Sequence, residues 1–211
     1  MLPAYDELQR TWTRLHHFGH LQSMAGWDRA AMMPPKGNDA RAAAMAEMDG
    51  LMTRVEPGFI RVDADELTYP AHVILRYHIE RALIEGSIEA EDIPALWDES
   101  MRSLLGVDSR GNYQNGCLQD LHWSSGAFGY FPCYTLGAMY AAQWFAAIRR
   151  SVPDLDAHIA QGDLAPVFDW LRDHIWTQAS RWDTAELATR ASGETLNPLH
   201  FRRHLEARYL G

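Results

Sequence analysis

The sequence predicts an all-α protein, and three observations lead to that prediction. Apolar residues recur every three or four positions in most segments between turn signals, which is the period of an amphipathic helix. Alternating apolar and polar runs, which are typical of strands, are nearly absent. Proline and glycine stand mainly at the ends of the helical patterns, where they stop or start a helix. With 211 residues, of which 47% are apolar, the chain is long enough to bury a core.

The N-terminal part predicts a helical hairpin. Residues 4–31 form its first arm, because leucine, tryptophan and methionine recur there at near-helical spacing. Pro34 and Pro35 end this arm, since proline lacks a backbone donor and restricts the residue before it. Asn38 or Asp39 then caps a second arm that is rich in alanine and methionine.

Further helices are expected after Pro57, which ends the hairpin. The first of them is capped by Asp63 or Asp65 and runs to Gly86, with a kink expected at Pro70. The remaining helices are expected at residues 93–106, 136–148, 154–161, 164–180 and 197–209. We therefore divide the chain into an N-terminal helical hairpin and a C-terminal helical part, which form one structural unit and have the bounds 1–55 and 56–211.

Charge and cysteine content exclude several classes of partner. The formal charge of -9 and the pI near 5.5 argue against nucleic acid and anionic membranes, which select basic surfaces. Cys117 and Cys133 cannot form a disulfide framework, and they indicate a reducing compartment. The first residues lack the features of a signal peptide, and no apolar stretch approaches membrane-spanning length. We expect a cytoplasmic protein that binds neither nucleic acid nor membranes.

The stretch from Gly116 to Gly137 is the most unusual part of the chain. No helical or strand period fits it, yet it is too aromatic for a solvated linker. A glycine-rich, aromatic segment between two helical patterns predicts a buried loop that builds a site. Besides four glycines and His122, it contains the aromatic residues Trp123, Phe128, Tyr130, Phe131 and Tyr134.

Several motifs in this sequence resemble those of one family. Residues 116–123 read G-x-x-Q-D-x-H-W, and residues 129–137 read G-Y-F-P-C-Y-x-L-G. Residues 60–65 read I-R-x-x-A-D, and residues 27–34 read W-D-x-x-x-x-M-P. These motifs follow one another along the chain in the order and with spacing like those of the carboxypeptidase Taq family of zinc metallocarboxypeptidases, which the chain therefore resembles. The resemblance implies a mainly helical fold and an activity that removes C-terminal residues from peptides.

The zinc centre of that family has no counterpart in this sequence. The resemblance implies an H-E-x-x-H motif, in which two histidines bind zinc and the glutamate acts as general base, and a later glutamate as third ligand. None of the ten histidines here begins such a motif. The sequence passes from the hairpin at Val55 almost directly to the motif that begins at Ile60, so we interpret the central region of the family as deleted. We expect no zinc cofactor and no peptidase activity without it.

Two histidine pairs have a spacing that suits metal binding. His16 with His20, and His200 with His204, stand four residues apart and can share a helix face. A catalytic zinc site needs three protein ligands and an open position, so neither pair replaces the missing centre. We expect these pairs to be exposed surface residues.

Arg61 is the first of four residues to which the resemblance gives a role. It matches the arginine that helps to hold the C-terminal carboxylate of the substrate, and a guanidinium group suits that task because it forms two parallel hydrogen bonds to a carboxylate. The alternative is a structural ion pair with Asp63, Asp65 or another acid nearby.

The other three residues lie in the aromatic stretch. His122 and Tyr130 match catalytic positions of the family, and Tyr134 matches a position that binds substrate. For His122 the alternative is a buried histidine that is hydrogen-bonded to Asp120, Gln119 or a backbone carbonyl. For the two tyrosines the alternative is packing within the loop.

The leading hypothesis is a carboxypeptidase Taq-like protein that has lost its zinc site and serves as a binding, regulatory or assembly module. It could still capture a peptide C-terminus without cutting it. The alternative is an active zinc metallocarboxypeptidase that releases C-terminal residues from peptides, either alone or with a complementary protein that supplies the metal-binding half. Because the deletion would uncover apolar rows such as Met45, Met48 and Met52, we also expect a homodimer.

Overall fold

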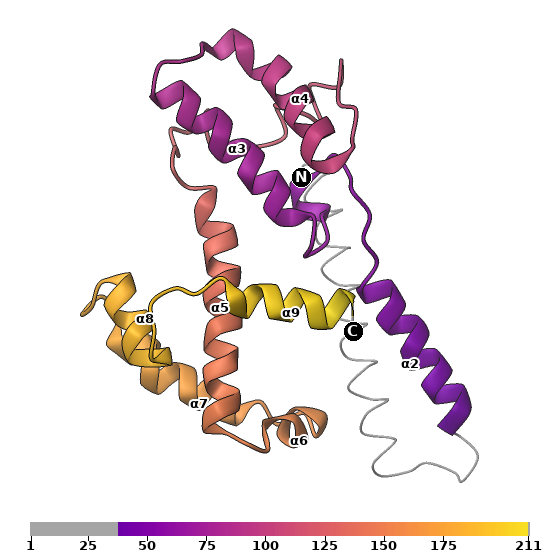
Figure 1. The fold of residues 1–211 in the computed structure, drawn as a ribbon, viewed down its shortest axis with the longest axis vertical. Coiled ribbons are helices and arrows are strands. Elements are labelled where there is room, and N and C mark those ends of the chain that lie inside the picture. The colour runs from indigo at the N-terminus through magenta and orange to yellow at the C-terminus, as the bar shows by residue number, and fades with distance from the viewer. Residues whose placement is uncertain (1–37, 211) are drawn as a thin grey trace, which may run out of the picture. The chain divides into compact units, whose positions relative to one another are not determined.

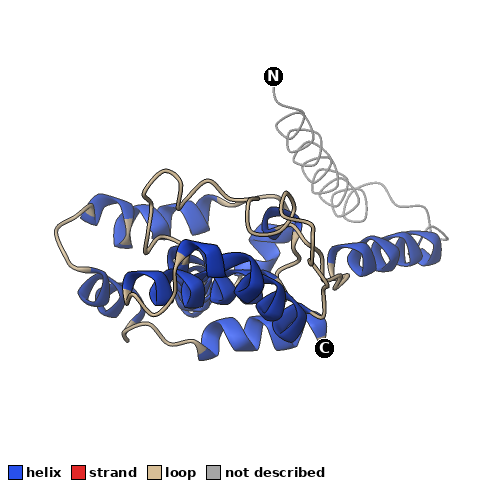
Figure 2. Ribbon diagram, turned by 90° about the horizontal axis from the view of Figure 1, so that it is seen from above, coloured by secondary structure: helices blue, strands red, loops and turns tan. Residues whose placement is uncertain are grey.

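A computed structural model describes residues 38–210, and this part of the chain consists of helices and loops without a strand (Figure 2). The all-α prediction is therefore confirmed for these residues. The first arm of the predicted hairpin lies outside them. The α-helices are α2 (Asn38–Met52), α3 (Tyr69–Ile84), α4 (Ile93–Leu105), α5 (Pro132–Ser151), α6 (Leu155–Ala160), α7 (Ala165–His174), α8 (Thr184–Ser192) and α9 (Leu199–Tyr209). Short 3-10 turns occur at Arg61–Asp63 (η1), Ala90–Asp92 (η2) and Trp176–Gln178 (η3).

The chain forms two compact units. One takes in helix α2 together with Phe145–Gly193, and the other comprises Thr53–Trp144 and Glu194–Gly211. Helix α5, the long helix in Figure 1, begins in the second unit and ends in the first. Among residues 38–210, no helix is long and apolar enough to cross a membrane.

Helix α3 begins later than the sequence predicts. Asp65 accepts hydrogen bonds from the backbone of Leu67 at 3.0 Å and of Thr68 at 2.9 Å, and this turn holds the chain just before the helix starts at Tyr69. Pro70 therefore lies in the first turn, where a missing N–H leaves no hydrogen bond unmade. The expected helix from residue 63 or 65 with a kink at Pro70 is wrong.

Helices α3 and α4 pack against each other and hold the main core of the second unit (Figure 1). Burying each large apolar side chain contributes about 1.5–3 kcal/mol. Helix α4 ends at Gly106, as the sequence predicts, because this glycine adopts the left-handed conformation with φ 69° and donates its N–H to the carbonyl of Arg102. The core consists of Leu75, Ile79, Trp97, Met101 and Leu105.

Three helices of the C-terminal part differ from the prediction. Helix α5 begins at Pro132 rather than at residue 136, since proline suits the first turn of a helix. Helix α7 ends at His174, well before residue 180. Helix α8 was not predicted, although Asp183 caps it by accepting a hydrogen bond from the N–H of Glu186 at 2.8 Å. It spans 9 residues and contains a single buried one, so it gives little apolar periodicity.

Candidate functional site

The loop between α4 and α5 is joined to the segment before α3 through Gln119. The side-chain amide of Gln119 donates to the carbonyl of Phe59 at 2.9 Å and accepts from the N–H of Arg61 at 3.0 Å. One glutamine thus forms two hydrogen bonds to a segment about 60 residues earlier in the chain. These bonds fix the backbone of both motif stretches, I-R-x-x-A-D and G-x-x-Q-D-x-H-W, against each other.

Asp120 connects two buried arginines at the centre of the site. Its Oδ1 accepts from Nη2 of Arg61 at 2.9 Å, and its Oδ2 accepts from Nε of Arg76 at 2.6 Å. Arg61 is 6% exposed and Arg76 is fully buried. Arg76 also donates to the carbonyl of His72 at 2.7 Å, one turn earlier in α3. The carboxylate therefore neutralises part of the charge of two guanidinium groups that have little access to water.

The charges in this cluster are set by burial and by one another. Burial favours a higher pKa for Asp120, but Arg76 and Arg61 outweigh it and hold the pKa below its ordinary value. Burial lowers the pKa of Arg76 to about 10 despite the opposing effect of Asp120, so this guanidinium stays charged at neutral pH. Burial, together with Arg76 and Arg61, lowers the pKa of His72 to about 4, so its imidazole is neutral. Within the described part of the chain, neither ring nitrogen of His72 has a hydrogen-bond partner.

Two tyrosines enclose the outer side of the Arg61 guanidinium group. Tyr69 accepts a hydrogen bond from Nη1 of Arg61 at 2.7 Å. The Cζ of Arg61 lies 4.7 Å from the ring centroid of Tyr134, which allows a cation–π interaction. The two tyrosine rings meet edge to face at 6.3 Å. Arg61 thus has partners on several sides, and its side chain is 7% exposed.

His122 is held by Tyr134 rather than by a neighbour in its own motif. Its Nε2 lies 3.0 Å from Oη of Tyr134, and its ring packs on Phe131 with centroids 4.3 Å apart. Its Nδ1 is buried and lies 3.8 Å from Oδ1 of Asp120, which is beyond hydrogen-bond distance. The expected alternative partners Asp120 and Gln119 do not bond this ring, so the phenol of Tyr134 sets its orientation.

Tyr130 lies at the outer edge of the same cluster. Its ring centroid is 5.7 Å from that of His122 and 5.4 Å from that of Tyr134. It is 50% exposed, in contrast to the buried Phe131 beside it. The structure therefore brings together all four residues that the sequence singles out, Arg61, His122, Tyr130 and Tyr134. Their roles in binding or chemistry stay predictions.

Helix α3 supports the loop with a row of ionisable side chains that the sequence reading did not single out. His72, Arg76 and Glu80 stand four residues apart and are all buried. Glu80 accepts a hydrogen bond from Nε1 of Trp123 at 3.3 Å, and Arg76 donates one to Asp120, so both side chains bind residues of the loop. The signal that could have revealed them is the four-residue repeat itself, because it places three ionisable residues on one face of the helix.

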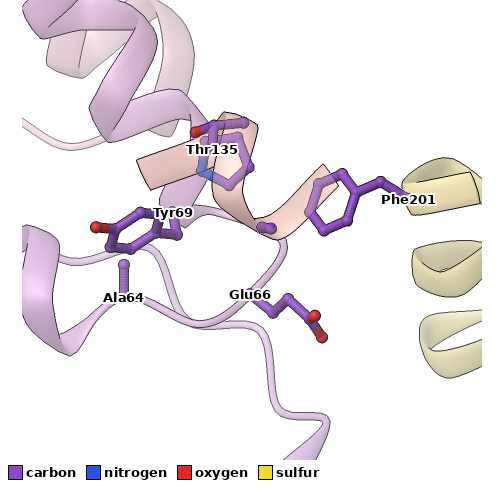
Figure 3. A pocket seen from close by; sticks show the side chains of 7 residues that line it. Ala64, Glu66, Tyr69, Thr135 and Phe201 are labelled. Atoms are coloured by element: carbon purple, nitrogen blue, oxygen red, sulfur yellow. The ribbon is translucent and has the colours of Figure 1, made fainter. Parts of the chain in front are cut away.

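A cavity of about 380 Å³ adjoins the cluster through Tyr69, and Figure 3 shows the side chains that line this cavity. Tyr69 belongs to both, since its hydroxyl bonds Arg61 and the residue also lines the cavity. At the rim, Glu66 lies 2.7 Å from Nε2 of His204 and 3.4 Å from Nε of Arg208, which fastens α9 to this turn. The cavity is lined by Ala64, Glu66, Tyr69, Pro70, Thr135, Ala138 and Phe201.

The described residues do not fit the zinc centre that the resemblance implies. Among residues 38–210, no three His, Cys, Asp or Glu side chains are grouped so that they could hold a metal ion. His200 lies 2.8 Å from a carboxylate oxygen of Glu194 and its side chain is only 10% exposed, so the expectation of an exposed residue is wrong for His200. His204, whose side chain is 42% exposed, lies 2.7 Å from a carboxylate oxygen of Glu66. The pair of His16 and His20 lies outside the described residues.

Comparison with known proteins matches this chain to one family. The family model described as carboxypeptidase Taq (M32) metallopeptidase matches residues 50–209. Thermostable carboxypeptidase 1 of Thermus thermophilus is 35% identical over 212 residues, which cover 99% of this chain and 40% of the relative. Carboxypeptidase 1 of Bacillus subtilis is 40% identical over 154 residues, which cover 73% of this chain and 30% of the relative.

Solved structures agree with the sequence matches. Metallocarboxypeptidase 1 of Trypanosoma cruzi has a TM-score of 0.78 and 46% identity, over 90% of this chain and 39% of that one. Pyrococcus furiosus carboxypeptidase has a TM-score of 0.76 and 32% identity, over 89% of this chain and 37% of that chain. The chain spans between 30% and 40% of the length of the curated relatives that it matches. It belongs to the carboxypeptidase Taq (M32) metallopeptidase family.

Proposed function

We propose that this chain is a non-catalytic member of its family, which acts as a binding, regulatory or assembly module. The observation that carries the proposal is the lack of an H-E-x-x-H motif among its ten histidines. Hydrolysis by a catalytic zinc ion needs three protein ligands and a bound water, and neither histidine pair supplies such a set. The proposal includes a cytoplasmic location, in keeping with the acidic composition and the two free cysteines Cys117 and Cys133.

The hydrogen bonds of Arg61 indicate that its guanidinium group has a structural role rather than binding a substrate carboxylate. Its Nε and both terminal nitrogens already donate, to Asp120 and to Tyr69. A peptide carboxylate that approached this guanidinium would have to displace Tyr69 or compete with Asp120. Capture of a peptide C-terminus is therefore the less favoured form of the binding function. The test uses one peptide in two forms, with a free C-terminal carboxylate and with a C-terminal amide. If the chain does not capture C-termini, it should bind the two forms with equal affinity.

The proposal is tested by measuring zinc and activity on the same preparation. The full chain is purified without chelators, its zinc content is measured after dialysis, and the release of C-terminal residues from a peptide is followed. Carboxypeptidase 1 of Bacillus subtilis serves as the control under the same conditions. We expect zinc well below one ion per chain and no release above background. Zinc that stays bound at one ion per chain, with activity that a chelator removes, would refute the proposal.

A second function, that of a zinc metallocarboxypeptidase completed by another protein, is favoured by one observation. Arg61, His122, Tyr130 and Tyr134 still form one cluster, with Tyr134 in contact with each of the other three. A complementary protein that carries the metal ligands could then use this cluster. The test is the activity of any complex that purifies with the full chain. In such a complex, His122→Gln should reduce peptidase activity without releasing the partner.

A further inference from the structure

Asn115 is the one asparagine of this chain that stands directly before a glycine. The sequence contains asparagine at positions 38, 112, 115 and 197, and Gly116 follows only Asn115. An asparagine side chain loses ammonia when the backbone nitrogen of the next residue attacks its amide carbon. Glycine favours this attack, because it has no Cβ that would shield the nitrogen. Asn115 is therefore the asparagine at which this reaction is chemically easiest.

The side chain of Asn115 is available for such a reaction. Asn115 is exposed, and among the residues that the structure describes its side-chain amide has no hydrogen-bond partner. Two other asparagines have side chains that form hydrogen bonds. Asn112 accepts from the N–H of Asn115 at 3.3 Å, and Asn197 donates to a carboxylate oxygen of Glu194 at 2.8 Å. Asn197 also precedes Pro198, whose nitrogen carries no hydrogen and cannot make the attack.

The packing of the loop requires the glycine that makes Asn115 reactive. Gly116 is buried, and a Cβ at this position would lie 2.6 Å from the carbonyl oxygen of Asn112. Glycine is the residue that permits such a close approach of two backbone segments. Any other residue would displace this turn, so the reactive pair of Asn115 and Gly116 is part of how the loop folds.

The closed loop holds the attacking nitrogen in a different arrangement. The N–H of Gly116 donates to the carbonyl of Tyr113 at 3.2 Å. The side-chain amide of Gln119 donates to the carbonyl of Asn115 at 2.7 Å and to that of Gly116 at 3.2 Å. To reach the amide carbon of Asn115, the nitrogen of Gly116 has to leave its hydrogen bond, and the peptide unit has to rotate. The bonds of Gln119 oppose that rotation.

We propose that Asn115 is a site of spontaneous modification and that Gln119 controls its rate. The backbone nitrogen of Gly116 gives its proton to hydroxide and forms a bond to Cγ of Asn115. The bond between Cγ and the side-chain nitrogen breaks, and ammonia leaves with a proton taken from water. Water then opens the resulting five-membered imide at one of its two carbonyls, which gives aspartate or isoaspartate. The inference does not depend on whether the chain binds zinc.

Isoaspartate at this position should keep the loop from closing again. In isoaspartate the main chain runs through Cγ, which adds one atom to the backbone inside the turn. The carbonyl oxygens that bind the amide of Gln119 are then displaced, and so is its contact with the N–H of Arg61, which is 3.0 Å long in the closed loop. Aspartate adds a charge at the same exposed position but keeps the length of the backbone.

The test follows Asn115 in the full chain during incubation at a mildly alkaline pH. Peptide mapping by mass spectrometry measures asparagine, aspartate and isoaspartate at this position, and Asn112 in the same map is the internal control. The natural chain is compared with Gln119→Met, whose fold is verified by circular dichroism. A peptide with the sequence of residues 112–118, with serine in place of Cys117, gives the rate without a fold.

We expect slow conversion in the natural chain, conversion about tenfold faster in Gln119→Met, and the fastest conversion in the peptide. When opening of the loop is fast relative to the reaction, the rate follows the population of the open form, which the loss of the Gln119 hydrogen bonds raises by about this factor. An Asn115 that stays intact in Gln119→Met until the peptide is fully converted would overturn the proposal. Equal rates in the natural chain and in Gln119→Met would overturn the control by Gln119.

A second measurement needs no change at Gln119. The isoaspartate form of the natural chain is isolated by chromatography and compared with Asn115→Asp, which carries the charge without the additional backbone atom. Hydrogen exchange at the N–H of Arg61 should be faster in the isoaspartate form only, because this N–H donates to Gln119 in the closed loop. Equal exchange in the two proteins would refute the opening of the loop by isoaspartate.

Discussion

Asp120 and Arg76 form an ion pair in which Nε of the arginine lies 2.6 Å from Oδ2 of the aspartate, and the arginine has no access to solvent. Arg61 shares the same carboxylate from the other side. Asp120 is thus the common anion of two buried cations. Removing a partner from a buried pair costs more than the pair itself contributes, because the remaining charge is left without compensation.

Asp120→Asn should therefore destabilise the chain strongly. The amide keeps the shape of the side chain but leaves two buried guanidinium groups without an anion, so we expect a loss of about 3–5 kcal/mol in the free energy of unfolding. Urea unfolding followed by circular dichroism measures it. Asp108→Asn is the control, because Asp108 pairs with Arg110 at an exposed site, where the loss of an ion pair should leave the stability almost unchanged. Equal effects of the two substitutions would contradict the central role of Asp120.

His72 should make the stability depend on pH between about 4 and 6.5. Its pKa is lowered from 6.5 to about 4 in the folded chain, so the unfolded chain binds a proton more readily across this range. The contribution of neutral His72 to the free energy of unfolding is therefore fully present above pH 6.5. It is lost as the pH falls towards 4, and the loss for this group alone is up to about 3 kcal/mol. Asp120 acts in the same direction at lower pH, since its folded pKa is also lowered. The measurement is urea unfolding at a series of pH values.

The comparison variant for this pH effect is His72→Gln, which cannot be protonated in this range. Its unfolding free energy should vary less between pH 6.5 and 4 than that of the natural chain. Parallel curves for the two proteins would show that other groups cause the dependence.

Two glycine substitutions should change stability in opposite directions. A Cβ at Gly116 would lie 2.6 Å from the carbonyl oxygen of Asn112, so Gly116→Ala should cost about 1–3 kcal/mol through displacement of the backbone. Gly137 lies within α5, and a Cβ there meets no atom within 4 Å. Gly137→Ala should therefore stabilise the chain by about 0.4–1 kcal/mol. Thermal unfolding of both variants measures the difference, and a neutral Gly116→Ala would show that the loop can move.

Tyr69→Phe should test the link between the cavity and the arginine cluster. The substitution keeps the ring that lines the cavity and removes the oxygen that accepts from Arg61. Hydrogen bonds to charged groups contribute about 1.5–3 kcal/mol, so we expect a loss near the lower end of that range. Tyr113→Phe, at an exposed position, should leave the stability almost unchanged. If both variants unfold alike, the Arg61–Tyr69 contact contributes little in solution.

The sequence predicted those parts of the fold that depend on local signals. Gly106 marks the end of α4 because a left-handed terminal residue favours glycine wherever it occurs. The aromatic stretch could be recognised as a site-forming loop from its composition. Arg76 could not be found in this way, since its partner Asp120 lies 44 residues further along the chain. The start of α3 at Tyr69 does have a local signal, Pro70 in the first turn, which the prediction interpreted as a kink instead. The role of Tyr134 as partner of His122 has no local signal.

The hydrogen bond between Arg61 and Asp120 spans 59 residues, and helices α3 and α4 both lie between its ends. The hydrogen bond thus closes a loop of the chain that contains both helices. The tip of that loop, from Glu85 to Glu89, is exposed except at Ile88. Closure entropy grows only with the logarithm of loop length, so doubling the loop costs only about 0.6 kcal/mol. A fluorescent protein or an affinity tag could be inserted at Gly86–Ser87 while the hydrogen bond between Arg61 and Asp120 stays intact. This turn would then be a suitable labelling position for following the chain in cells.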